Sequence, residues 1–296
     1  MEEAKYMRTD VGLTDSEYID IATIQSTMIG PLWARAKFSQ RYPNILEDKE
    51  AADIFAKVIR KHPEAQEELA TMEQLVDEFL SLFFLVRARV FDDAMREYLV
   101  RKPDASVVNL GCGLDTTFSR VDNGRIHWYD LDLPDAIQYR LSIINESPRC
   151  KCIPKSVFDL SWFENVDFSP GRGAFFIAGG LFSYFHEESL ISLCDSMAKQ
   201  FPGAELIFDA GSRIGNMFVN RRFRKYGIRG VKQQFDLGNP TKQIVKWSDR
   251  IRVVEWFAHF TRTQREQDWK WRTRVMMNLC DWFNLSKFAH LRFSSE

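Results

Sequence analysis

The chain has 296 residues, with 40 basic and 41 acidic side chains and a formal net charge of −1. Hydrophobic residues make up 45% and aromatic residues 14%, which is typical of a globular protein with large buried rings. Because the opposite charges are balanced and intermixed, no single-sign field favours nucleic acid or an anionic membrane as a partner. The N-terminus lacks a secretion signal and the longest apolar run, residues 79–86, is too short to cross a bilayer, so we expect a cytoplasmic protein.

Residues 14–100 are predicted to be helical, because apolar residues recur three and four positions apart and acidic residues stand near the segment starts. Four prolines are expected to mark kinks or joints between these helices: Pro31, Pro43, Pro63 and Pro103. We therefore expect residues 1–100 to form a helical cap.

From Ser106 onward, short apolar strands alternate with amphipathic helices. The predicted strands are 106–110, 125–132, 151–154, 173–180, 204–211, 250–260 and 285–293. Predicted helices lie between them at 115–121, 134–145 and 187–201, and the basic segment from residue 213 and the segment from residue 269 are also helix-like. This alternation predicts an α/β fold with a doubly wound, mostly parallel, seven-stranded sheet. We expect one ligand-binding domain over residues 101–296, with a lid around 213–245.

The five cysteines are an odd number in a chain without a secretion signal, which indicates reduced thiols. Cys150 and Cys152 form a close pair, but no second pair or neighbouring histidine completes a zinc-ligand spacing. We interpret them as ordinary strand residues and predict no metal site.

The stretch VVNLGCGLDTTFSR, residues 107–120, runs from a strand through a Gly-x-Gly turn into a helix. Such a turn is expected to place free backbone N–H groups at the carboxyl edge of the sheet, where open α/β sheets bind ligands. The dinucleotide fingerprint requires a third glycine where this chain has Thr116, so an NAD-dependent oxidoreductase is disfavoured.

Two later loops at the same edge carry carboxylates. Asp130 and Asp132 in WYDLDLP stand about 20 residues beyond the glycines, where an acid meets the hydroxyls of a ribose, although one of them could instead cap the helix starting at Pro134. Asp159 and Leu160 follow the next strand, and an acid beside an apolar residue suits an adenine ring.

These motifs, in this order, resemble the leucine carboxyl methyltransferase and polyketide-type O-methyltransferase family. VVNLGCGLDTTFSR is similar to its "VNLGAGxDT" turn, WYDLDLP to its "EVDxP" strand end, and RARVFDD to its "RTRFFDD" helix. The likeness extends more loosely over residues 30–296. It implies a class I, Rossmann-like methyltransferase that uses S-adenosylmethionine.

The resemblance also implies roles for individual residues. Arg87 would pair with the methionine carboxylate of the cofactor, for which a guanidinium is suited, unless Asp92 and Asp93 neutralise it. Gly111, with Gly113 in the same turn, would line the cofactor, Asp132 would hold the ribose, and Asp159 with Leu160 would contact the adenine.

One position departs from the family pattern. Where "AEGxxxY" has a glutamate, this chain has Gly179, which we place at the cofactor, and Asp209 is a candidate to supply the missing carboxylate. The matching aromatic residue, Tyr184, is the candidate catalytic residue, with a core ring as the alternative.

The resemblance favours transfer of a methyl group to a carboxylate or hydroxyl of a small molecule. A carboxylate needs no general base, and His186, the histidine nearest a strand end, is interpreted as a helix start. The alternatives are a protein C-terminal carboxylate as acceptor, which the basic run RRFRKYG could attract, and a degenerate relative that binds the cofactor without turnover.

Overall fold

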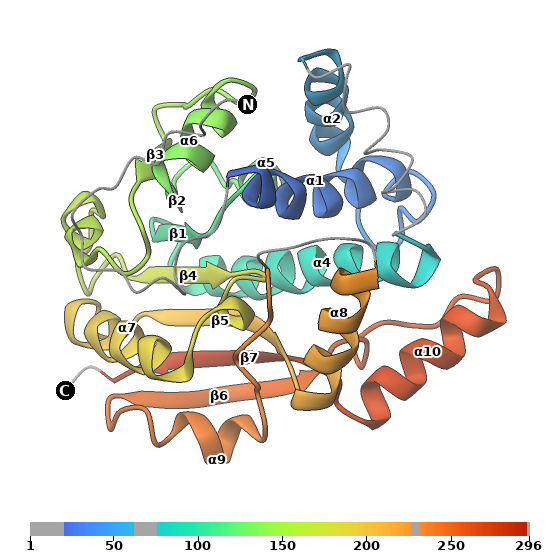
Figure 1. Ribbon diagram of the computed structural model, residues 1–296. Coiled ribbons are helices and arrows are strands. Elements are labelled where there is room, and N and C mark those ends of the chain that lie inside the picture. The colour runs from blue at the N-terminus through green and yellow to red at the C-terminus, as the bar shows by residue number, and fades with distance from the viewer. Residues whose placement is uncertain (1–20, 62–75, 226–230, 295–296) are drawn as a thin grey trace, which may run out of the picture.

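The computed structural model describes residues 21–61, 76–225 and 231–294, and these residues fold around one seven-stranded sheet (Figure 1). The strands are β1 Ser106–Leu110, β2 His127–Asp132, β3 Cys150–Pro154, β4 Ala174–Ala178, β5 Glu205–Gly211, β6 Ile251–Ala258 and β7 Ser286–Phe293. Their order in the sheet is β3-β2-β1-β4-β5-β7-β6. The strand order reverses between β1 and β4, and this switch is the place where open sheets bind ligands.

Strand β7 alone runs against its neighbours, since it pairs antiparallel with both β5 and β6, while the remaining neighbouring pairs are parallel. The predicted doubly wound, mostly parallel sheet of seven strands is therefore confirmed. This arrangement agrees with the fold that the resemblance implies.

Helices cover both faces of the sheet. The longer ones are α1 Ile21–Phe38, α2 Lys49–Lys61, α4 Glu78–Arg101, α6 Pro134–Leu141, α7 Glu187–Gln200, α8 Arg213–Lys225 and α10 Trp271–Trp282. The short ones are α5 Thr117–Val121, η2 Leu160–Asn165, η3 Phe182–Tyr184 and α9 Pro240–Ile244.

Alternate residues of the central strands point to opposite faces, and each face has its own core. Val108 and Phe176 join the core that α7 and η2 cover, whereas Val107 and Phe175 join the core that α4 and α10 cover. Because both faces of a central parallel strand are buried, its sequence is mostly apolar, as in the fully buried SVVNL and AFFIA.

The expected helix boundaries hold with small shifts, and three of the four prolines can be placed. Helix α1 continues through Pro31, so this proline is not a joint between helices and its expected kink stays a prediction, whereas Pro43 and Pro103 lie between elements. Pro63 and the predicted helical residues 14–20 and 62–75 lie outside the described residues. Asn239 precedes Pro240 and caps α9, since its side chain accepts the backbone N–H of Lys242.

Two smaller expectations concern the cysteines and the membrane. Cys150 and Cys152 lie in β3 as predicted, and all five cysteines are free thiols. Across the described parts of the chain, every helix is too short or too polar to span a lipid bilayer. The division into a helical cap and a cofactor domain stays a prediction.

Candidate active site

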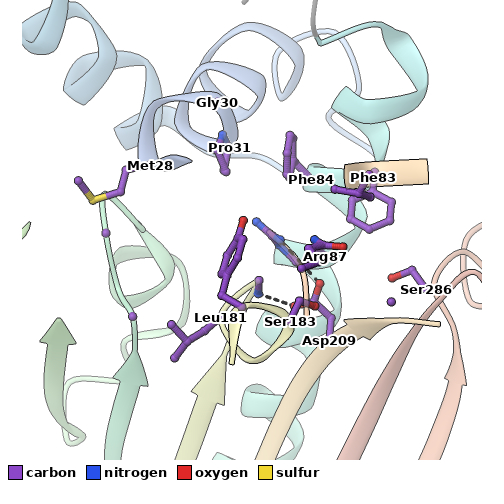
Figure 2. A pocket seen from close by; sticks show the side chains of 18 of the residues that line it. Met28, Gly30, Pro31, Phe83, Phe84, Arg87, Leu181, Ser183, Asp209 and Ser286 are labelled. Carbon is purple, nitrogen blue, oxygen red and sulfur yellow. Dashed lines mark hydrogen bonds and ion pairs between the residues drawn. The ribbon is translucent and has the colours of Figure 1, made fainter. Parts of the chain in front are cut away.

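A large cavity lies at the carboxyl edge of the sheet. Its volume is about 1200 Å³, and its walls come from α1, α4, α8, α10 and the loops that follow β1 to β5. Figure 2 shows Arg87 and Asp209 on one side of this space and Met28 and Pro31 of α1 on others. The cavity thus gathers segments from residue 28 to residue 286 in one place.

The glycine turn lines the cavity, but its backbone N–H groups are not free. Gly111 and Cys112 both donate to the Leu131 carbonyl, at 2.8 and 3.2 Å, and Gly113 donates to the Asp132 carboxylate at 2.8 Å. The expected free donors are therefore wrong for these three residues, because the end of β2 uses them. What the glycines provide is close packing: Gly111 has φ +65, and a Cβ there would lie 2.7 Å from a Leu181 methyl group.

Asp132 lies at the end of β2 and reaches the cavity. One carboxylate oxygen accepts the Gly113 N–H and the other accepts the Leu133 N–H, each at 2.8 Å. Burial raises the pKa of this carboxyl, and the two backbone donors oppose that rise. Helix α6 begins at Pro134 without a side-chain cap, so Asp132 is not the expected capping residue of that helix.

Asp130 has a structural role and does not line the cavity. Its carboxylate pairs with Arg140 at 2.7 Å and accepts the indole N–H of Trp128 at 2.8 Å, and all three side chains are buried. The two roles expected for this residue, a ribose contact or a helix cap, are both wrong. Asp130, the first acid of WYDLDLP, supplies the counter-charge that the buried guanidinium of Arg140 needs.

Arg87 projects from α4 toward the ends of β4 and β5. Its guanidinium lies 3.7 Å from the Asp209 carboxylate and over the Phe84 ring at 5.1 Å, and 15% of its side chain is exposed. Asp209 also accepts the Gly180 N–H at 2.6 Å. Burial raises the pKa of the Asp209 carboxyl, whereas the positive charge of Arg87 lowers it.

The alternative that Asp92 and Asp93 neutralise Arg87 is wrong. Asp92 is buried and pairs with Arg120 at 2.8 Å, and Asp93 faces Arg89 at 3.2 Å. Arg120 also reaches Asp48, the residue that caps α2, so these charges join the N-terminal helices to the helix after the glycine turn.

Asp159 and Leu160 lie beyond the cavity wall. Asp159 caps η2 by accepting the N–H and hydroxyl of Ser161 at 3.1 and 2.7 Å. The described residues of this loop that do line the cavity are Lys155, Ser156, Val157 and Phe158. The structure therefore brings the predicted loop to the site through the residues just before the predicted pair.

Gly179 and Tyr184 both line the cavity. A Cβ on Gly179 would lie 2.8 Å from the Phe91 ring, so the backbone packs tightly against this ring. Burial raises the pKa of the Tyr184 phenol, which stays protonated at neutral pH. His186 begins α7 as its N-cap residue, so its interpretation as a helix start is confirmed.

Sequence reasoning missed most of the apolar side of the cavity. Aromatic and aliphatic side chains, here called the apolar wall, come from three helices: Phe79, Leu80, Phe83 and Phe84 of α4, Phe218 of α8 and Met276 of α10. Phe83 and Phe84 precede Arg87 by four and three residues, so helical spacing places them on one face with it. This spacing could have been used to predict that Phe83 and Phe84 lie beside Arg87 in the cavity.

The segments of this cavity up to the end of α7 fall within a match to a known protein family. The sequence profile described as leucine carboxyl methyltransferase matches residues 28–198, which is more than half of the chain. The protein belongs to the leucine carboxyl methyltransferase family. This membership confirms the expected family and the expected class, an S-adenosylmethionine-dependent methyltransferase.

Two relatives match this leucine carboxyl methyltransferase family protein over most of its length. The S-adenosyl-L-methionine-dependent methyltransferase dpfgK of Gibberella zeae is 23% identical, over 92% of this chain and 94% of its own. The tetracenomycin polyketide synthesis O-methyltransferase TcmP of Streptomyces glaucescens is 27% identical, over 76% of this chain and 79% of its own.

Solved structures agree in fold. A putative methyltransferase from Thermobifida fusca matches with a TM-score of 0.56 at 14% identity, over 77% of this chain and 89% of its own. A DUF574 family protein from Streptomyces avermitilis matches with a TM-score of 0.54 at 10% identity, over 88% of this chain and 97% of its own. At these identities the comparison shows the fold alone.

Proposed function

We propose that this methyltransferase acts on oxygen, transferring a methyl group to a carboxylate or hydroxyl of a small molecule. The observation that carries the proposal is the single cavity that Asp132, the Arg87–Asp209 pair and the apolar wall line together. Its charged residues suit a nucleoside amino acid, and its apolar wall suits an organic acceptor.

Arg87 and Asp209 suit the amino-acid end of S-adenosylmethionine. A guanidinium binds a carboxylate and a carboxylate binds an ammonium group, so a neighbouring pair of opposite charges matches an amino-acid zwitterion. Asp209 would in this way supply the carboxylate that the family has at the position of Gly179. The close approach of Arg87 to Gly180, where a Cβ would lie 2.6 Å from the guanidinium, keeps the charge at the strand ends.

Asp132 suits the sugar. Each of its oxygens already accepts one backbone N–H, which fixes the orientation of the carboxylate, and each oxygen keeps a lone pair for a ribose hydroxyl. The adenine would then lie near Val157 and Phe158, with Asp159 and Leu160 following in the same loop. These contacts are proposals drawn from position and chemistry.

When bound, S-adenosylmethionine supplies a methyl group on a positively charged sulfur. The chain's own residues hold the two reactants in one cavity and surround them with apolar side chains, which exclude water from the reacting oxygen. None of the described residues that line the cavity is a histidine. A carboxylate acceptor fits this wall well, because it is already ionised and needs no proton removed.

Oxygen as the acceptor atom is supported by the printed activity of the relative TcmP, an O-methyltransferase. Tyr184, whose phenol stays protonated, can donate a hydrogen bond to an acceptor oxygen and orient it. This is the role that we propose for Tyr184.

The test is a methyl-transfer assay with S-adenosylmethionine labelled in the methyl group and a panel of aromatic acids and phenols. Alkali releases labelled methanol from a methyl ester but not from a methyl ether, so one treatment distinguishes a carboxylate acceptor from a hydroxyl acceptor. Label in a nitrogen- or carbon-methylated product would contradict the proposal.

A protein C-terminal carboxylate remains the second candidate, because Arg221, Arg222 and Arg224 of α8 line the cavity and could attract a negatively charged chain end. Incubating a cell lysate with labelled cofactor and counting alkali-labile label in the protein fraction distinguishes it from the small-molecule proposal. The degenerate alternative predicts no transfer in either assay, and the carboxylate of Asp209 argues against it.

A further inference from the structure

Ser286, the first residue of β7, brings a hydroxyl to the wall of the cavity. In the sheet it pairs with Gly211, two residues beyond Asp209 on β5. Both Ser286 and Phe83 line the cavity, and Figure 2 shows them around the same space as Arg87. Neither sequence pattern nor the proposed cofactor contacts give this hydroxyl a role.

Behind Ser286 lies His259, a histidine with no exposed surface. Its imidazole stacks on the Phe83 ring with centroids 3.6 Å apart and planes 10° apart, and the rings of Phe260 and Phe288 lie 4.8 Å away. Burial lowers the pKa of His259 to about 3, so the ring is neutral at pH 7. Three aromatic neighbours hold this neutral ring in one orientation.

The hydrogen bonds of His259 decide where its single proton lies. Nε2 is 2.9 Å from the backbone carbonyl oxygen of Phe83, and a carbonyl can only accept, so Nε2 carries the proton. Nδ1 is therefore a bare acceptor, and it lies 3.2 Å from the Ser286 hydroxyl. The Ser286 proton is consequently donated to His259, and the hydroxyl offers only its lone pairs to the cavity.

We propose that Ser286 selects acceptor molecules that bring a hydrogen-bond donor, such as a hydroxyl, to this wall of the cavity, an inference that rests on the proposed function. An ether oxygen or an ionised carboxylate in the same place would set lone pairs against lone pairs, with no proton between them. The acceptor of this enzyme accordingly carries a hydroxyl or N–H group besides any ionised group. His259 acts through Ser286 and is a positioning residue.

The proposal is tested with two probes, 1-naphthol and 1-methoxynaphthalene, in the second of which a methyl group replaces the hydroxyl proton and so removes the donor. Each is titrated by fluorescence into protein saturated with S-adenosylhomocysteine. The preference of each protein for 1-naphthol is the dissociation constant of 1-methoxynaphthalene divided by that of 1-naphthol. This preference should be roughly 3- to 10-fold larger in the wild-type protein than in Ser286→Ala, which is the effect expected from one hydrogen bond. Ser286→Thr keeps the hydroxyl and should keep the wild-type ratio.

A second readout does not depend on any ligand. In the nitrogen NMR spectrum of the histidine side chains, His259 should be neutral and protonated on Nε2, and Ser286→Ala should shift the Nδ1 resonance while leaving the tautomer unchanged. A proton on Nδ1, an unchanged probe ratio in Ser286→Ala, or no binding of either probe would each overturn the proposal. Failure of the wild-type protein to bind S-adenosylhomocysteine would instead count against the proposed function, and the tautomer would still decide the direction of the Ser286 hydrogen bond.

Discussion

The carboxylate of Asp209 accepts the Gly180 N–H at 2.6 Å and lies 3.7 Å from the guanidinium of Arg87. Two strand ends and one helix are thus joined at a pair of opposite charges that lines the cavity. We infer that this pair, rather than a glutamate at position 179, recognises the amino-acid end of the cofactor.

Asp209→Asn should therefore weaken binding of S-adenosylhomocysteine roughly 10-fold, because an amide cannot pair with an ammonium group as a carboxylate does. Isothermal titration calorimetry measures the change. The matched control is Asp93→Asn, which alters an exposed acid on α4 and should leave the dissociation constant unchanged. Equal affinities for wild-type protein and Asp209→Asn would remove Asp209 from the cofactor site.

Gly180→Ala should lower both stability and cofactor affinity. Gly180 has φ +68, which strains any other residue by about 1–2 kcal/mol, and the new methyl group would lie 2.6 Å from the Arg87 guanidinium and displace it. Thermal unfolding and calorimetry measure the two effects.

Gly124→Ala is the control for backbone strain alone, because Gly124 has φ +81 with nothing within 4 Å of the added methyl group. It should destabilise the protein to a similar degree and leave S-adenosylhomocysteine binding intact. If both variants bound with wild-type affinity, Arg87 would not depend on this glycine.

His259 should make the protein sensitive to acid. Its pKa is lowered to about 3 in the folded state, so below its usual value of 6.5 the unfolded chain takes up a proton that the folded chain does not. The contribution of His259 to the free energy of unfolding is fully present above pH 6.5. It falls by about 1.4 kcal/mol for each pH unit between roughly pH 6 and pH 4.

Urea unfolding of wild-type protein and His259→Phe at a series of pH values measures this slope. The variant lacks the titrating ring. The free energy of unfolding of the wild-type protein minus that of the variant should therefore decrease as the pH falls. His186→Gln, at an exposed histidine, is the control variant. A difference that stayed constant between pH 7 and pH 4 would contradict a buried, neutral His259.

The sheet could be predicted from the sequence because strands buried on both faces are mostly apolar, as in SVVNL and AFFIA. The turn at Gly111 and the acid at Asp132 could be found for a similar reason, since each lies at the end of a largely buried strand. The partner of each acid could not be predicted: Asp130 and Asp132 look equivalent in WYDLD, and only the fold brings Arg140 to the first of them.

Contacts between distant segments also could not be predicted from the sequence. Asp209 meets Arg87 across 122 positions of the chain, and His259 meets the Phe83 carbonyl across 176. The prediction of free amides in the glycine turn failed because the Leu131 carbonyl, on a neighbouring strand, accepts two of them. Local patterns carry no information about such pairings.

The central claim is that the cofactor lies across the sheet edge with its sugar at Asp132 and its amino-acid end at Arg87. Calorimetric titration with S-adenosylhomocysteine and with 5′-methylthioadenosine, which lacks the amino-acid end, tests it most directly. Arg87→Ala should weaken S-adenosylhomocysteine roughly 10- to 100-fold and leave 5′-methylthioadenosine unchanged, whereas Asp132→Asn should weaken both. Equal losses of both ligands in Arg87→Ala, or no binding of either ligand by the wild-type protein, would contradict it.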